Sequence, residues 1–130
     1  MSYFEKVKDM AQELGFVPEN ENIEEELFTV SDSENGINCL VVDCEDPVLV
    51  LEMVVMSCTD SVNPVRLLQM NREMVHGAFV LDDSAQKVIW RDTLQIENLD
   101  LNELQGSISA LSLALSENAN EIIRMSKGGK

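Results

Sequence analysis

The sequence is short of basic residues, aromatic residues and histidine. It has 9 Lys and Arg against 24 Asp and Glu, a net charge of −15, and aromatic residues make up only 5% of the chain. Nucleic acids and anionic membrane surfaces are bound through Lys and Arg, so neither is expected as a partner. The shortage of basic residues is concentrated in the first half of the chain, because no basic residue occurs between Lys8 and Arg66. A one-sided negative field serves solubility or steers a basic protein partner, and both interpretations stay open at this point.

Cysteine and long apolar runs are also scarce. Cys39, Cys44 and Cys58 show no CxxC spacing, which predicts neither a disulfide framework nor a zinc site. We expect Cys39 and Cys44 to be small core residues. The longest apolar run, residues 48–56, is interrupted by Glu52 and is too short to cross a bilayer. The N-terminus lacks the layout of a secretory signal, so the sequence predicts a cytoplasmic protein without a membrane partner.

Motifs of catalysis and cofactor binding are missing from the sequence. There is no GxSxG, HExxH or EF-hand pattern, and the only Gly-Gly pair, at 128–129, lies in the tail. His76 is the only histidine and is expected at a helix end beside Gly77, where it would contact terminal carbonyls. The sequence therefore predicts no cofactor, no metal and no catalytic residue. An enzyme that uses His76 and a cysteine is the alternative.

Helix caps and turn residues divide the chain into elements. Ser2 with Glu5 and Asp100 with Glu103 form capping boxes, and Asn63 precedes a proline at the first position of a helix. Short turns between the strands predict antiparallel pairing. The predicted order is α-β-β-β-α-β-β-α, with helices at 2–15, 63–77 and 100–122, strands at 27–31, 37–44, 48–57, 78–81 and 87–94, and a disordered tail at 127–130. The fold class is α+β, a single domain over residues 1–130 with helices packed on an antiparallel sheet.

Two predicted strands have apolar residues on both faces. In the strand at 48–57, positions 49, 51, 53 and 55 are apolar, and so are positions 48, 50, 54 and 56 on the other face, around Glu52. The strand at 37–44 places Ile37, Cys39 and Val41 on one side and Leu40 and Val42 on the other. In an antiparallel sheet with one face in water, apolar and polar residues should alternate more regularly along each strand. The second face is therefore covered either by this domain's own helices or by a subunit or partner peptide.

The sequence resembles the class I type III secretion chaperones, the Tir-chaperone or CesT-like family, whose fold is shared by YbjN-like bacterial domains. The resemblance rests on a helix LLQMNREM, the segment HGAFVLDDSAQKVIWRDTL, and LDLNEL at the start of a long apolar helix. Leu81-Asp82, Trp90-Arg91 and Leu99-Asp100 match the family's turn, strand and helix-start positions. The family has a Gly-rich segment before its fourth strand, which is predicted here at 78–81, and this chain has only Gly77 in that place. A YbjN-like regulatory or stress domain unrelated to secretion is therefore the alternative.

The resemblance implies a non-enzymatic homodimer that binds an extended segment of a partner protein without ATP. It also assigns two sets of residues. The implied partner-binding residues are Phe4, Val7, Phe28, Val30, Val50 and Val54. The implied dimer-interface residues are Leu67, Leu68, Phe79 and Leu81.

Overall fold

The computed structural model describes residues 2–127. Its helices are α1 (Tyr3–Glu13), α2 (Pro64–Arg72), α3 (Leu101–Glu117) and α4 (Ala119–Lys127), and a short 3-10 turn, η1, spans Ser33–Asn35. Its strands are β1 (Glu19–Asn22), β2 (Leu27–Asp32), β3 (Ile37–Glu45), β4 (Val48–Ser57), β5 (Ala78–Leu81) and β6 (Lys87–Gln95). The predicted α+β class and element order are confirmed, with two additions, β1 and α4.

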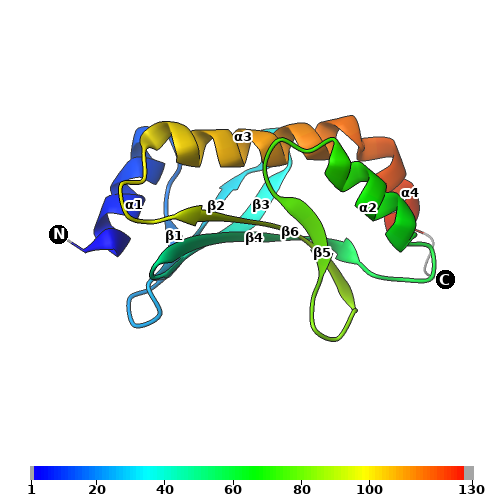
Figure 1. Cartoon of the computed structure of the whole chain (residues 1–130), viewed down its shortest axis with the longest axis horizontal. Helices are drawn as coiled ribbons and strands as arrows, with labels where there is room; N and C mark the ends of the chain where they lie inside the picture. The colour runs from blue at the N-terminus through cyan, green and yellow to red at the C-terminus, as the bar shows by residue number, and fades with distance from the viewer. Residues whose placement is uncertain (1, 128–130) are drawn as a thin grey trace.

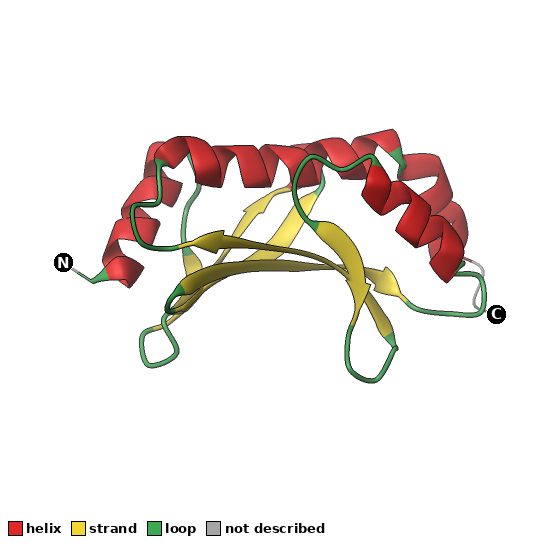
Figure 2. Cartoon of the chain, viewed as in Figure 1, coloured by secondary structure: helices red, strands yellow, loops and turns green. Residues whose placement is uncertain are grey.

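The six strands form one antiparallel sheet in the order β1-β2-β3-β4-β6-β5. All four helices lie on the same side of this sheet (Figure 1). We call that side the helix face and the opposite side the outer face. The β1–β2 and β5–β6 turns project away from the helices, so that the sheet arches between them (Figure 2).

The predicted caps start three helices. The Ser2 hydroxyl accepts a hydrogen bond from the Glu5 N–H at 3.2 Å, and the Asn63 side chain accepts from the first turn of α2. Asp100 and Glu103 form the capping box of α3. Asn118 then interrupts the helix that was predicted to continue, because its side-chain amide donates to the Ala114 carbonyl at 2.8 Å. α4 therefore has its own axis and packs against β4.

Two bulges change which strand residues face the helices. Cys39 adopts φ +55°, and the β2–β3 register shifts beside it, so Ile37 and Leu40 both point into the core. The prediction that Cys39 packs in the core is wrong, because its side chain is exposed, whereas Cys44 is buried as expected. A second shift, between Val54 and Met56, turns Met56 to the helix face opposite Val88.

Trp90 is the largest side chain buried in the core, and it lies directly beneath Gly77. A Cβ atom on Gly77 would stand 2.5 Å from the indole ring, and its φ of +77° is one that other residues rarely adopt. The chain therefore needs glycine at this position for two separate reasons. α2 ends at Arg72 rather than near Gly77, so His76 lies in the exposed connection to β5 and not at a helix end.

Gly77→Ala should be strongly destabilising, with a loss of about 3 kcal/mol in the free energy of unfolding from overpacking against Trp90 and from the positive φ. Gly15→Ala is the matched control, since Gly15 has φ +95° but nothing within 4 Å of its Cβ position. The control should cost about 1 kcal/mol. Urea denaturation of the two variants measures the difference, and equal losses would show that the contact with Trp90 is irrelevant.

Candidate protein-binding surface

The outer face of the sheet presents three rows of side chains, defined by the strand register. Val54, Ile89 and Val80 form an apolar row across β4, β6 and β5. A second row runs from Val41 through Glu52 and Arg91 to Ala78. The third row runs from Leu27 through Asp43 and Val50 to Thr93. No helix of residues 2–127 covers these rows (Figure 1), so apolar side chains from five strands lie on an open surface.

Of the two β4 valines predicted to bind a partner, Val54 is 52% exposed and Val50 only 8%. Val50 is shielded by its neighbours on the same face, and Val54 is the β4 valine that a partner could bury. Between them, the Glu52 carboxylate pairs with the Arg91 guanidinium directly across the ladder. This pair is partly exposed, so it adds little stability but places charge in the middle of the apolar surface.

Asp43 lies on the same face next to Val50 and has an unfavourable environment. Its Oδ1 is buried without a hydrogen-bond partner among the described residues. Burial is the main cause that raises the pKa of this carboxyl from 3.8 to about 6, and Glu45, Glu25 and Glu52 add to it. The negative charge on Asp43 therefore destabilises the free protein at neutral pH.

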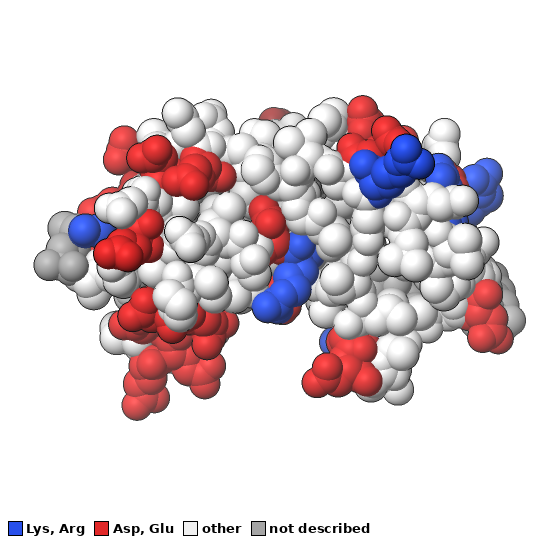
Figure 3. Space-filling model, in the orientation of Figure 1, with Lys and Arg blue, Asp and Glu red and all other residues white. Residues whose placement is uncertain are grey.

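The surroundings of the outer face are acidic. The β1–β2 turn contains glutamates at residues 24–26, and the β5–β6 turn contains Asp82 and Asp83. Carboxylates gather at both projecting turns in Figure 3. Four basic residues belong to α2 and α4, namely Arg66, Arg72, Arg124 and Lys127, and Arg66 forms a two-bond pair with Glu121 at 2.7 Å.

Four of the residues predicted to bind a partner are core residues on the helix face. They are 0–3% exposed, packed between α1 and β2: Phe4, Val7, Phe28 and Val30. A partner can reach these side chains only if α1 moves, so their role in partner binding stays a prediction.

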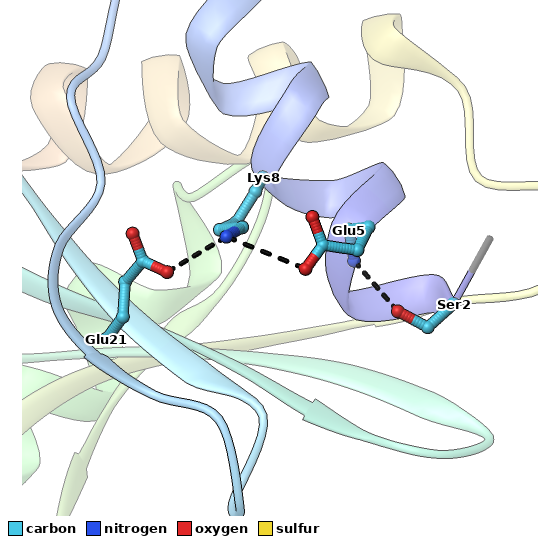
Figure 4. A network of polar contacts seen from close by, with 4 residues as sticks. All are labelled: Ser2, Glu5, Lys8 and Glu21. Carbon is cyan, nitrogen blue, oxygen red and sulfur yellow. Dashed lines mark hydrogen bonds and ion pairs between the residues drawn. The ribbon is translucent and has the colours of Figure 1, made fainter.

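A polar network ties α1 to β1 over these core residues (Figure 4). The Lys8 ammonium donates to Glu21 at 2.9 Å, pairs with Glu5 at 3.6 Å and lies 5.1 Å from the centre of the Phe4 ring. The hydrogen bond to Glu21 is the main cause that raises the pKa of Lys8 above 10.5. Lys8 thus helps to hold α1 over the sheet.

The residues predicted for a dimer interface separate into two pairs. Leu67 and Phe79 are buried, whereas Leu68 is 69% exposed and Leu81 is 40% exposed. Val65 and Val75 are exposed on the same segment. Because α2 packs on β5, the end of the molecule formed by α2 and β5 gathers several exposed apolar side chains, and we call it the α2–β5 surface.

Known proteins that are similar to this chain share its fold. The family model CesT_Tir_1 matches residues 1–128. The chain belongs to the CesT_Tir_1 family. This confirms the resemblance to secretion chaperones and YbjN-like domains. No curated protein sequence matches the chain.

Solved structures extend this likeness at low identity. YbjN from E. coli is 15% identical, with a TM-score of 0.70 over 90% of this chain and 91% of that one. The HopA1–SchA chaperone–effector complex contains a chain that is 15% identical, with a TM-score of 0.65 over 87% and 91%. The Yersinia pestis type III secretion chaperone SycH, in complex with a fragment of YscM2, is 17% identical, with a TM-score of 0.59 over 96% and 100%.

Within residues 2–127, no group of three or more His, Cys, Asp and Glu side chains could hold a metal ion. No helix in that range is long and apolar enough to span a membrane. A hollow of about 710 Å³ opens between α3 and the β2–β3 connection, with Ile37 and Ile108 among the apolar residues of its lining and Asp32 and Glu34 among the acidic ones.

Sequence reasoning missed Asp43 and Arg91 as members of the outer face. A signal for Asp43 was present, because an aspartate inside the apolar run LVVDC is unusual in a strand. Glu45 lies two residues on in the same strand, but Glu25 and Glu52 come from other segments, and their approach to Asp43 could not be read from the sequence.

The raised pKa of Asp43 gives stability a pH dependence with a definite sign. The folded state binds the proton more tightly than the unfolded state, so this group lowers the free energy of unfolding as pH rises from about 4 to about 6. Asp43→Asn should therefore be more stable than the wild type at pH 7, by about 1 kcal/mol, and the difference should shrink toward pH 4. Denaturation at both pH values checks this. A variant less stable than the wild type at pH 7 would contradict it.

Proposed function

We propose that this chain is a non-enzymatic, ATP-independent, chaperone-like protein that binds a segment of a partner protein on the outer face of its sheet. The observation that supports this most is the open apolar surface of Val41, Val54, Ile89 and Val80, with all four helices on the other side. Similar chains of the same fold occur in complexes with effectors or other proteins. Membership of a chaperone family supports the same role.

The charge pattern supports a cationic, amphipathic partner segment. The outer face has apolar rows, a destabilised carboxylate at Asp43 and acidic turns on both sides. A Lys or Arg side chain of the partner would relieve the repulsion among Asp43, Glu45 and Glu25, while an apolar side chain would cover Val54. The acidic composition also argues against a nucleic acid or an anionic membrane as the ligand.

A second candidate is a YbjN-like regulatory or stress domain that has no secretion substrate. The structural likeness to YbjN and the reduced Gly-rich lead at Gly77 favour it. Both candidates have the same fold and predict a protein partner. They differ in what that partner is, and partner identification after purification from the native cytoplasm distinguishes them.

Val54→Asp should abolish recovery of the partner without unfolding the protein, because Val54 is half exposed and a charge there stays in water. The double substitution of Val50 and Val54 is less informative, since an aspartate at the 8% exposed Val50 would be buried and costly. Ile123→Asp is the matched control, at 49% exposure on α4. Affinity purification of the three proteins, with melting curves, is the measurement. Equal recovery of the same partner with Val54→Asp would refute the outer face as the site.

We also propose that the chain forms a homodimer through the α2–β5 surface, with Leu68 and Leu81 buried between the copies and Leu67 and Phe79 supporting them from below. Two-fold pairing is the commonest way for a small domain to cover such a surface. Four of the exposed large apolar residues, Val65, Leu68, Val75 and Leu81, belong to this end.

Leu68→Glu should convert the dimer to a monomer, because two-fold symmetry would place two unpaired carboxylates in one interface. Light scattering across a dilution series should give about twice 14.5 kDa for the wild type and 14.5 kDa for the variant. Ile23→Glu, in the β1–β2 turn at the other end, should remain dimeric. A wild type that is monomeric at every concentration would remove the dimer proposal.

A further inference from the structure

Strand β5 is an edge strand, with β6 on one side and no strand on the other. Edge strands present unpaired N–H and C=O groups, to which another chain can add a strand. β5 belongs to the same surface as the proposed dimer contact. Whether this edge is open therefore decides how a second copy can bind here.

The Asn71 side chain of α2 occupies the open edge of β5. The Phe79 N–H donates to Asn71 Oδ1 at 2.8 Å, and Asn71 Nδ2 donates to the Phe79 carbonyl at 3.2 Å. One carboxamide thus satisfies both backbone groups of one residue, as a residue of a paired antiparallel strand would do. The N–H and the carbonyl oxygen of Phe79 both point away from β6. An added strand would have to pair with β5 on that same side.

Little of the edge remains free beyond Asn71. Backbone groups alternate along a strand, so Ala78 and Val80 point toward β6, and Leu81 points outward like Phe79. The next residue, Asp82, turns its N–H back to the Lys87 carbonyl at 3.1 Å. A single free residue is too short to hold an added strand. Leu68, three residues before Asn71, lies beside it on the helix and supplies apolar area instead.

We propose that Asn71 is a specificity-determining residue for self-association: it closes the β5 edge, so that a second copy meets the α2–β5 surface through side chains and not by extending the sheet. The inference deepens the proposed dimer and rests on it for the identity of the occupant. The closure of the edge itself depends only on the two hydrogen bonds of Asn71.

Asn71→Ala tests the closure because it removes the carboxamide and opens space beside Phe79. We expect light scattering to give a mass above the wild type that rises with concentration, as strands add at the opened edge. Gln69→Ala, the neighbouring exposed carboxamide on α2, is the matched control and should behave as the wild type.

Amide hydrogen exchange of the wild type provides a second readout that needs no variant. The Phe79 amide should exchange at least about tenfold more slowly than the outward Leu81 amide. Equal protection of both amides would mean that a strand already covers the edge, and this would overturn the proposal. An Asn71→Ala protein that is folded, has a fast-exchanging Phe79 amide and keeps the wild-type mass would also overturn it. If the variant does not fold, the exchange measurement decides alone.

The two proposals fail in different ways. A monomeric wild type would remove the dimer, while the rise in mass of Asn71→Ala would still test the edge. A dimeric wild type with a protected Leu81 amide would keep the dimer and remove the role of Asn71.

Discussion

The structure depends on one asymmetry: the sheet is apolar on both faces, and the helices cover only one. The buried core lies between the helices and the side chains of Trp90, Phe28 and Leu51, among others on the helix face. On the outer face, Val50 is shielded by its neighbours in the sheet, whereas Val54 is not. The fold therefore buries the core on the helix face but leaves apolar side chains on the outer face exposed to solvent. A monomer tolerates only a limited area of this kind. Partner binding and self-association both follow from this incomplete cover.

Much of the architecture could be predicted because local signals decide it. The caps at Ser2, Asn63 and Asp100 start helices at the expected residues, and the strand periods predict the sheet. The errors arise where backbone geometry changes the period. The left-handed conformation at Cys39 reverses which face of the sheet the preceding residues of β3 point to. The side chain of Asn118 ends α3 early. β1 was missed because its four residues, ENEN, are all polar and exposed.

The candidate site was less predictable than the fold. A resemblance placed Phe4 and Phe28 on a partner surface, but both belong to the core under α1, since an amphipathic helix and an apolar strand cover each other first. The two-faced pattern of β4 did lead to Val54 correctly as an exposed apolar residue. Asp43 interacts with Glu25 and Glu52 from other segments, and Asn71 binds the backbone of another element, so three-dimensional contacts were needed to find them.

The separation of charge along the chain gives the molecule an electric dipole. The acidic β1–β2 turn and the N-terminal half form its negative pole, and Arg66, Arg72, Arg124 and Lys127 on α2 and α4 lie at the opposite pole. An approaching cationic protein would rotate such a molecule before touching it, so that the acidic β1–β2 turn leads the encounter. This torque acts over about one Debye length, roughly 8 Å at physiological ionic strength, and added salt shortens that range.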